Sequence, residues 1–145
     1  MGQARDLMDR ATQAIFTKDW DALRALYAAD VVVTGPDVGT LHGVDQLVDY
    51  MKQFAGALPD MTYAMTRTLE TDTCAIDQGD VIGTNTGPIA LPDGSTIQPT
   101  VKQVRMRSID VATVDNGLIS QHDFYFDQLE LLTQLGLLEA PVAHA

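Results

Sequence analysis

The hydrophobic positions in the first half of the chain recur with the period of an α-helix. A first helix is predicted by one apolar stripe, formed by Leu7, Met8, Ala11, Ala14 and Ile15. Asp19 is placed to cap a second helix that continues through Tyr27. A third helix presents its apolar face over residues 44–55 and stops before Pro59, because proline cannot continue a helix.

The second half of the chain alternates apolar and polar residues with the period of a β-strand, and it is rich in β-branched residues. This pattern predicts strands at 61–69, 80–87, 97–111 and 117–127. One further short strand, at 31–34, is predicted in the first half of the chain. The turn-rich segment 39–43 is expected to be a connection. Two turn signals are typical of hairpins, Pro92-Asp93-Gly94 and Asp115-Asn116-Gly117. A short leucine-rich helix is expected over 129–138.

Helices and strands are thus largely segregated along the chain, which favours an α+β fold over a doubly wound α/β fold. We expect N-terminal helices packed on a strongly curved, mostly antiparallel sheet that encloses a cone-shaped pocket. The 145 residues suit one domain, and no linker or repeat divides them. A single domain over 1–139 is predicted, followed by a flexible tail at 140–145.

The charge balance argues against polyanionic partners. The chain has 20 acidic and 9 basic residues, a net charge of −11, which disfavours nucleic acid or an anionic membrane as the main partner. No stretch approaches the roughly 20 apolar residues of a membrane helix, and the N-terminus lacks a signal-peptide pattern. A cytoplasmic protein is the expectation. The lone cysteine, Cys74, allows no internal disulfide and reads as a small core residue.

Motifs for cofactors and metals do not occur in the sequence. There is no glycine-rich phosphate loop and no dinucleotide fingerprint. The three histidines, His42, His122 and His144, do not have the spacing of helical metal ligands. We therefore expect neither a metal nor a cofactor.

The densest group of reactive side chains is the segment 121–127 on the last predicted strand. Strand alternation places Asp123, Tyr125 and Asp127 on one face and His122 on the opposite, aromatic face. Apolar surroundings raise the pKa of a carboxyl group because desolvation disfavours its charged form. A carboxyl group tuned in this way can take up and return a proton near neutral pH, without a metal or cofactor.

Other interpretations of the same side chains stay open. A polar stripe on a strand is also typical of a solvated sheet face or a dimer interface, and His122 also suits a core or interface histidine. Gln103 and Arg105 share one face of the preceding strand, where Arg105 could polarise a carbonyl or form a cross-strand ion pair, for instance with Asp123. Trp20 is a candidate for the pocket mouth or for the core.

Three segments resemble one protein family. Residues 124–136, FYFDQLELLTQLG, resemble the ending of SnoaL-like proteins, the polyketide cyclase family, in which an Asp closes the last strand before a leucine-rich helix. Gly83-Thr84-Asn85-Thr86-Gly87-Pro88, with the Pro92-Asp93-Gly94 turn and the segment 97–100, resembles a second family motif. The helix start at 41–45, LHGVD, resembles a third.

The resemblance implies the nuclear transport factor 2-like, or cystatin-like, α+β cone. It also implies that Asp127 is the general acid/base of an intramolecular aldol closure, as the matching Asp is in the cyclases. Two positions depart from the family pattern. Asp123 stands where many relatives have an aromatic residue, and Asn85 stands where many have a histidine.

The leading hypothesis is a cofactor-free enzyme that cyclises or isomerises a hydrophobic, enolisable small molecule. Asp127 would move the proton and Asp123 would tune its pKa or hold a water. Substrate hydrogen bonds are expected from Tyr125, His122, Asn85, Gln103 and Arg105. One alternative is hydrolysis of an epoxide, in which carboxylates activate a water. Another is a non-catalytic module that binds a small ligand or dimerises. The family resemblance implies a homodimer formed through the sheet.

Overall fold

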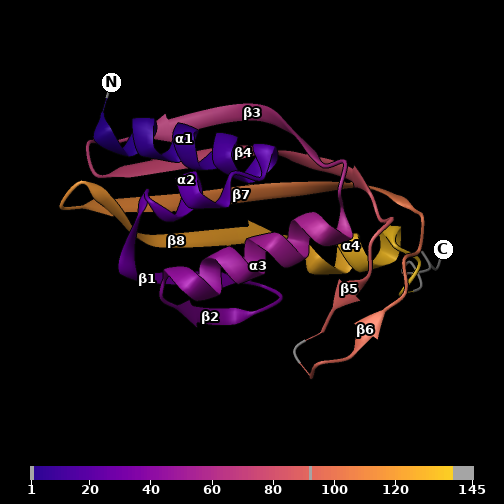
Figure 1. Ribbon diagram of the computed structural model, residues 1–145. Coiled ribbons are helices and arrows are strands. Elements are labelled where there is room, and N and C mark those ends of the chain that lie inside the picture. Colours follow the sequence, from indigo (N-terminus) through magenta and orange to yellow (C-terminus); the bar gives the residue numbers. More distant parts are fainter. Residues whose placement is uncertain (1, 92, 139–145) are drawn as a thin grey trace.

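The computed structural model describes residues 2–91 and 93–138, in which helices cover one face of a six-stranded sheet (Figure 1). The helices are α1 (Gln3–Thr17), α2 (Trp20–Arg24), α3 (Val44–Ala57) and α4 (Gln128–Gln134). The strands of the main sheet are β1 (Tyr27–Gly35), β2 (Gly39–His42), β3 (Thr62–Glu70), β4 (Cys74–Thr84), β7 (Gln103–Asp115) and β8 (Leu118–Phe126). A two-stranded hairpin is formed by β5 (Ile89–Ala90) and β6 (Thr96–Ile97).

The strand order of the main sheet is β2-β1-β8-β7-β4-β3. Within the described residues the pairing is antiparallel except between β1 and β8, which run parallel. The register shifts along the β3–β4, β7–β8 and β1–β8 pairs, and such irregularities bend strands and increase their twist. The predicted α+β architecture with a curved, mostly antiparallel sheet is confirmed.

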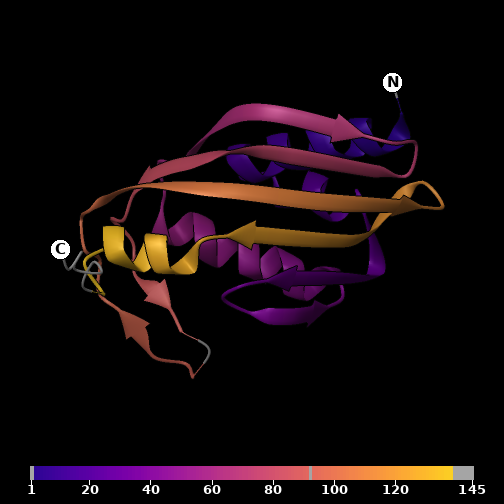
Figure 2. The same ribbon diagram turned by 180° about the vertical axis from the view of Figure 1, so that it is seen from behind.

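The two faces of the sheet differ. Figure 1 shows α1, α2 and α3 on the inner face, and Figure 2 shows the opposite, outer face of β3, β4, β7 and β8 without a helix across it. The core lies between the helices and the inner face, where the largest fully buried apolar side chains are Met8, Leu23, Leu47, Val31, Val33, Val48, Val104 and Ile119. None of the helices in the described parts of the chain has the length and apolar composition required to cross a membrane.

Several predicted boundaries were wrong. The second helix ends at Arg24, and Tyr27 begins β1, so the short strand predicted at 31–34 is longer at both ends. Leu26 and Tyr27 suit either element by their apolar character, and here both are buried, Leu26 in the turn after α2 and Tyr27 at the start of β1. The segment predicted as a connection at 39–43 contains β2, which pairs with β1 along the edge of the sheet.

The later strands differ in extent from the prediction. The strand predicted at 80–87 begins earlier, at Cys74. Its first half was not predicted, because Asp77 and Gly79 interrupt the apolar pattern there. The segment 97–111 divides between β6 and β7, and Val101 between them has a left-handed backbone with φ 60°. The turn after Asp115 is confirmed: Asn116 and Gly117 have φ of 51° and 78°, as a tight hairpin with two positive φ angles requires. The predicted tail, 140–145, lies outside the described residues.

A buried ion pair attaches α1 to the sheet. Arg5 is 4% exposed and Asp77 on β4 is 0% exposed, and Arg5 Nη1 donates to Asp77 Oδ1 at 2.6 Å. Arg5 Nη2 also donates to the backbone carbonyls of Leu69 and Ile76, at 3.2 and 3.3 Å. Burial raises the pKa of the Asp77 carboxyl group, and the contact with Arg5 opposes that rise.

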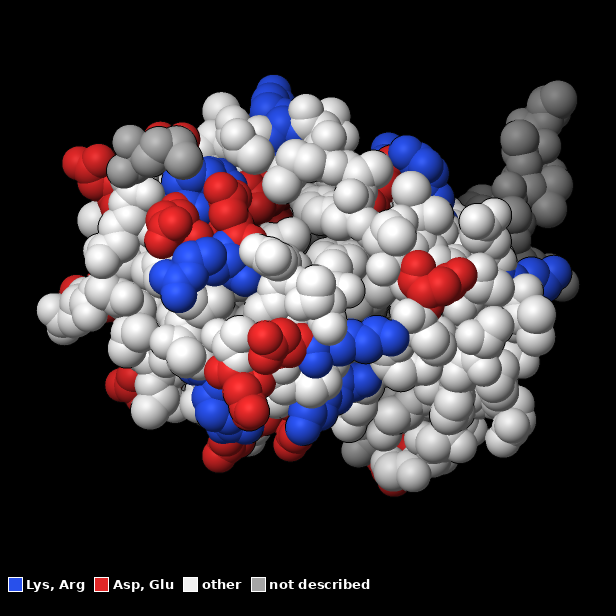
Figure 3. Space-filling model, turned by 45° about the horizontal axis from the view of Figure 1, so that its top comes forward, with Lys and Arg blue, Asp and Glu red and all other residues white. Residues whose placement is uncertain are grey.

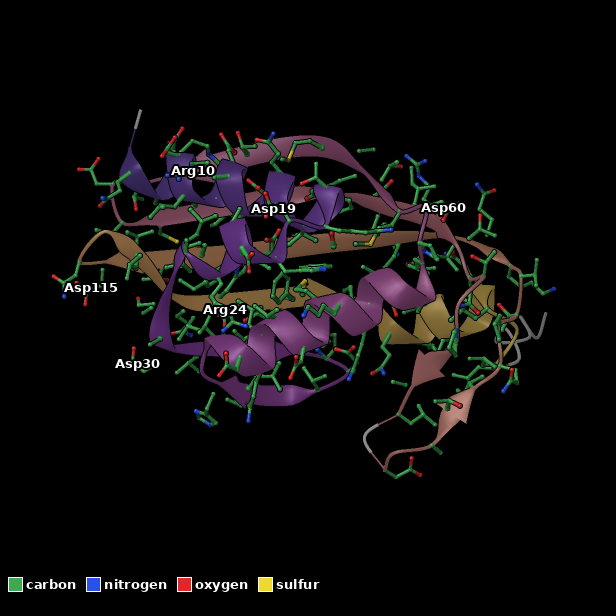
Figure 4. All side chains as sticks on the ribbon, viewed as in Figure 1. Arg10, Asp19, Arg24, Asp30, Asp60 and Asp115 are labelled. Carbon is green, nitrogen blue, oxygen red and sulfur yellow. The ribbon has the colours of Figure 1, made fainter. Side chains whose placement is uncertain are left out.

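Many other charged side chains lie at the surface, where acidic and basic groups are intermingled (Figure 3). Arg24 contacts Asp45 between α2 and α3, and Arg107 donates to Glu130 at 2.9 Å on the outer side. Figure 4 shows Asp30 and Asp115 at one end of the molecule, far from the helix-covered centre. Exposed pairs of this kind contribute little to stability, unlike the Arg5–Asp77 pair.

Replacing Arg5 by methionine removes the partner of a buried carboxylate. We expect Arg5→Met to lower the free energy of unfolding by about 3–5 kcal/mol at pH 7, because Asp77 then stays buried and uncompensated. Urea denaturation followed by circular dichroism measures this loss.

The matched control is Arg10→Met on the same helix. Arg10 is exposed, and its ion pair with Asp6, at 3.6 Å, lies at the surface. Its effect should stay within about 0.5 kcal/mol. Without Arg5, the folded-state pKa of Asp77 rises further above its unfolded value. The folded state then gains relative stability as the pH falls, and the deficit of Arg5→Met should narrow from pH 7 towards pH 5. A deficit that widens in acid would contradict this account of the pair.

Candidate active site

A small cavity, here called the inner cavity, lies between α1, α3 and the inner face of the sheet. Its volume is about 80 Å³. Most of its wall is apolar and includes Ile15, Phe16, Met51, Phe54, Met61, Val81, Met106, Phe124 and Phe126. The polar side chains in the wall are Thr12, Tyr50, Tyr63, Ser108 and Asp110. A carboxylate in a wall of this composition is the feature that marks the cavity as a candidate site.

Strand alternation places these groups on the inner face. On β7, Ser108 and Asp110 point inward, in line with the buried Val104 and Met106. On β8 the inward residues are His122, Phe124 and Phe126. The register sets Asp110 opposite Phe124 and Ala112 opposite His122. Because neighbours diagonal to each other on one sheet face are within reach of long side chains, Asp110 meets the ring of His122.

A chain of hydrogen bonds runs from Asp110 into the core. His122 Nε2 lies 2.7 Å from Asp110 Oδ2, and His122 Nδ1 lies 2.7 Å from the hydroxyl oxygen of Tyr27. His122 is 1% exposed and Tyr27 4%. The imidazole also stacks on Phe124, with ring centroids 4.1 Å apart. Asp110 is therefore the member of this Tyr27–His122–Asp110 chain that reaches the cavity wall.

The protonation of this chain follows from its ends. Burial raises the pKa of Tyr27, and the nearby charge of Asp110 raises it further, so Tyr27 keeps its proton. A neutral hydroxyl group can donate or accept, so the direction is set at the other end, where an ionised Asp110 carboxylate accepts from Nε2–H. A neutral imidazole then has no proton on Nδ1, and Nδ1 accepts from the Tyr27 hydroxyl group. The buried histidine thus orients the carboxylate and holds it as an acceptor at the cavity.

Tyr63 presents an unused hydroxyl group to the same cavity. Among the described residues its buried oxygen has no hydrogen-bond partner, although Ser108 is its neighbour in the cavity wall. Burial raises the pKa of Tyr63, as do the charges of Asp110 and Asp77, and the nearby Ser108 hydroxyl group opposes the rise. The phenol therefore keeps its proton at neutral pH. A buried donor without a partner is available to a ligand oxygen.

Gly79 on β4 gives the Tyr63 ring its room. A Cβ atom at position 79 would lie 2.5 Å from both Tyr63 Cε1 and the carbonyl oxygen of Ala64. The ring can therefore lie against the backbone of β4, and Phe16 of α1 stacks on it with centroids 5.6 Å apart. The position of the Tyr63 hydroxyl group depends on this missing side chain.

The two predicted catalytic carboxylates lie elsewhere. Asp123 and Tyr125 point to the outer face of the sheet, as the alternation with His122 requires. Asp123 accepts from Thr34 Oγ1 at 2.7 Å and from Gln121, and Tyr125 is 58% exposed. Asp127 caps α4, where its side chain accepts from the backbone N–H of Glu130 at 3.0 Å. None of the three is among the residues that line the inner cavity.

Gln103 and Arg105 also lie on the outer face. Gln103 is exposed, and Arg105 Nε donates to Asp80 at 2.7 Å across the sheet, so its ion pair is with Asp80 and not with Asp123. Trp20 begins α2 and packs against the core, outside the inner cavity. Of the predicted site residues, His122 alone belongs to the hydrogen-bond chain that reaches the inner cavity.

Asn85 lines a second, larger cavity of about 470 Å³, here called the outer cavity, between α3, α4 and the β5–β6 hairpin. Its amide nitrogen donates to the carbonyls of Ala57 and Gly87, and its amide oxygen accepts from the backbone and hydroxyl groups of Thr100. The side chain therefore joins the hairpin segment to the end of α3. Its role in substrate binding stays a prediction.

The residues that sequence reasoning missed are Asp110, Tyr63 and Ser108. One signal was present: Asp110 is a carboxylate on the strand face that carries Val104, Met106 and Ala112. The described residues contain no group of three or more His, Cys, Asp or Glu side chains arranged to hold a metal ion.

Comparison with known proteins identifies relatives of this architecture. The family model described as SnoaL-like domain matches residues 8–122. No match was found among the curated proteins. A candidate SnoaL-like polyketide cyclase from Jannaschia sp. CCS1 is 14% identical, with a TM-score of 0.82, over 96% of this chain and 94% of that chain.

Two solved structures from Streptomyces are similar as well. IdmH, a candidate polyketide cyclase of Streptomyces antibioticus, is 23% identical with a TM-score of 0.76, over 92% of this chain and 99% of that chain. AclR, a candidate hydroxylase of Streptomyces galilaeus, is 19% identical with a TM-score of 0.78, over 96% and 84%. At these identities the solved structures show a shared fold.

Replacing Gly79 by alanine should displace the Tyr63 ring. We expect Gly79→Ala to lower the free energy of unfolding by about 1–3 kcal/mol through overpacking, and to shift the ring signals of Tyr63 in NMR spectra. The control is Gly56→Ala on α3, where an added Cβ meets nothing within 4 Å. That change should raise stability by about 0.5–1 kcal/mol, because alanine is the better helix former. Equal effects of the two substitutions would contradict the packing argument.

A second prediction concerns which imidazole nitrogen of His122 carries the proton. In the neutral form of the imidazole, ¹⁵N spectra should show Nε2 protonated and Nδ1 unprotonated. In Tyr27→Phe, Nδ1 loses its donor, and we expect a loss of about 1–3 kcal/mol in unfolding free energy. Tyr125→Phe, at an exposed position, is the matched control and should be neutral. A proton found on Nδ1 in the wild type would reverse the assigned direction of the chain.

Proposed function

The chain belongs to the SnoaL-like domain family, and on that premise we propose that it is a cofactor-free enzyme that transfers a proton within a hydrophobic, enolisable small molecule, as a cyclase or isomerase does. The observation that carries this proposal is the placement of Asp110. Its carboxylate stands in the wall of an apolar cavity, 2.7 Å from a fully buried histidine, and Tyr63 presents an unpaired hydroxyl group to the same cavity.

The proposed chemistry is enolisation followed by carbon–carbon bond formation or reprotonation. Asp110 takes a proton from the carbon next to a substrate carbonyl, and the electrons of the broken C–H bond move to the carbonyl oxygen. The hydroxyl group of Tyr63 donates to this developing oxyanion. In a cyclisation, the enolate carbon attacks a second carbonyl, and the new alkoxide takes the proton back from Asp110. In an isomerisation, Asp110 returns the proton to another carbon.

His122 and Tyr27 support this step without touching the substrate. The Nε2–H bond to Oδ2 directs one lone pair of the carboxylate away from the cavity and leaves the other oxygen to act as base. The apolar wall, which includes Met106 and Phe126, excludes water and thereby strengthens every electrostatic contact inside the cavity. An enolisation needs only a positioned base and an oxyanion donor, and this cavity presents both.

The proton-transfer role therefore passes from Asp127 to Asp110 in this proposal. Asp127 already accepts a backbone N–H at the start of α4, and Asp123 is engaged by Thr34 on the outer face. The epoxide-hydrolase alternative relied on Asp123 as a second acid beside Asp127, and that pair does not line the inner cavity.

The alternative to an enzyme is a non-catalytic module that binds a small apolar ligand. Such a module would use the same cavities. Homodimerisation through the sheet stays a prediction. In the described part of the chain no helix crosses the outer face of β3, β4 and β8, and α4 lies at one end of β7 (Figure 2). This face carries Ile109 and Tyr125 directly opposite each other, 40% and 58% exposed.

Hydrogen–deuterium exchange tests the proposal without knowledge of the natural substrate. The probe is 2-tetralone, a neutral two-ring ketone with enolisable protons, in deuterated buffer followed by ¹H NMR. We expect the protein to accelerate exchange, and Asp110→Asn to reduce the acceleration by about 10²–10⁴-fold, the usual contribution of a general base.

The matched controls are Asp123→Asn and Asp127→Asn, which should keep the wild-type rate. Asparagine also accepts a backbone N–H at a helix start, so Asp127→Asn should remain folded. A loss of exchange in Asp127→Asn with Asp110→Asn active would return the role to Asp127. No exchange by the wild type with 2-tetralone bound would favour the ligand-binding module.

A further inference from the structure

The two cavities differ in size and in the presence of the acid/base group, and neither combines a ligand-sized volume with that group. The inner cavity holds the acid/base group but measures about 80 Å³, well below the roughly 300–1,000 Å³ of ordinary ligand sites. The outer cavity, of about 470 Å³, has the size of a ligand site but lacks the Tyr27–His122–Asp110 chain. Its wall is mainly leucine, isoleucine and alanine, from α3, α4 and the β5–β6 hairpin.

Tyr50 and Phe54 of α3 line both cavities and therefore stand between them. Tyr50 is 8% exposed, and its ring centroid lies 6.3 Å from that of Phe54 and 6.4 Å from that of Phe124. Phe54 in turn lies 6.3 Å from Phe126 at an edge-on angle of 69°. The residues common to both linings are thus two aromatic side chains of α3.

One hydrogen-bonded contact holds the Tyr50 side chain in place. Its hydroxyl group donates to the Asp37 carboxylate, with oxygen–oxygen distances of 2.9 and 3.1 Å. Asp37 follows β1 and lines the outer cavity. Burial raises the pKa of the Asp37 carboxyl group, and the bond from Tyr50 opposes that rise. Because neutral–charged hydrogen bonds of this kind are stronger than neutral ones, the contact favours the position in which the ring divides the cavities.

We propose that the inner and outer cavities are two parts of one elongated ligand site, divided by the Tyr50 side chain and joined when that side chain releases Asp37. The part of the proposal that concerns the reacting end of the ligand rests on the proposed function. The reactive carbonyl end enters the inner cavity and meets Asp110, while the larger apolar body stays among the leucines of α4.

The wall of the outer cavity also indicates the charge of that body. Of the described residues that line it, Asp37 is charged and none is Lys or Arg. A carboxylate in an apolar wall repels an anionic group and accepts a hydrogen bond from a neutral hydroxyl or a cationic group. The ligand class is therefore a multi-ring or long apolar molecule that is neutral or cationic at its outer part.

The probe for the test is N-phenyl-1-naphthylamine, a neutral three-ring fluorophore that exceeds the inner cavity in size. Equilibrium titration measures its Kd, and stopped-flow fluorescence measures its association rate. We expect Leu131→Trp, which fills the outer cavity, to raise the Kd at least about tenfold. Ala90→Trp on the hairpin fills the same cavity from an exposed position and guards against a folding defect of the first variant.

The Tyr50 contact is tested by rate. Tyr50→Phe removes the hydroxyl group and should increase the association rate by about tenfold, the scale of one hydrogen bond to a charged group. Asp37→Asn keeps a weaker acceptor and should give an intermediate rate. Tyr125→Phe on the outer face is the matched control and should associate at the wild-type rate. Wild-type rates in Tyr50→Phe would overturn the dividing role of Tyr50.

Contact between the bound probe and both cavities is the deciding observation. Nuclear Overhauser effects are expected from one bound probe to the methyl groups of Leu132, which lines the outer cavity alone, and to the ring of Phe124, which lines the inner cavity alone. Effects to Leu132 alone would overturn the two-part site. Two-part binding of the probe by the wild-type protein without acceleration of ketone exchange would count against the proposed enzyme and leave the two-part site standing.

Discussion

Each charged group buried in the inner face of this sheet requires a partner, and those partners determine where the neighbouring elements lie. Asp77 on β4 is paired with Arg5, which draws the start of α1 onto β3 and β4. Asp110 on β7 is paired with His122, and His122 with Tyr27 at the start of β1. Asp77 and Asp110 are direct neighbours in the β4–β7 register. The polar groups thus form a row across the sheet beneath an otherwise apolar layer of helices.

This arrangement separates a carboxylate that supports the fold from the carboxylate for which we propose a chemical role. Asp77 is enclosed by Arg5 and by backbone, so its charge serves the position of a helix. Asp110 is one strand further along the sheet, and the wall of the inner cavity leaves part of its carboxylate open. Two similar carboxylates therefore differ in use because one is covered by a helix and the other faces a space beneath aromatic side chains.

The fold was predictable because it depends on periodicity. The stripe of α1, the alternation of β3 and the Asn116-Gly117 turn are local patterns, and each survives in the structure. The helix cap at Asp19 does so as well, since its side chain accepts from Ala22. The segment 74–79 was missed because the buried Asp77 and Gly79 break the apolar pattern, and both are needed there for contacts made by distant residues.

The candidate site was only partly predictable for a related reason. Alternation correctly separated Asp123 and Tyr125 from His122, but it does not indicate which face the helices cover. The family resemblance favoured Asp127, and the backbone of α4 instead uses that carboxylate as a cap. Asp110 becomes significant only when β7 and β8 are in register, because its partner His122 comes from a different strand.

The bond between Tyr27 and His122 joins residues 95 positions apart, and the strands that bear them form the parallel pair of the sheet. Contacts so distant in sequence form late, since closing a long loop costs entropy before the contact repays it. During synthesis the N-terminal helices and β1 must wait for β8 before the sheet can be completed. A chain that stops short of residue 122 lacks His122, so the Tyr27–His122–Asp110 hydrogen-bond chain can form only after most of the sequence has been synthesised.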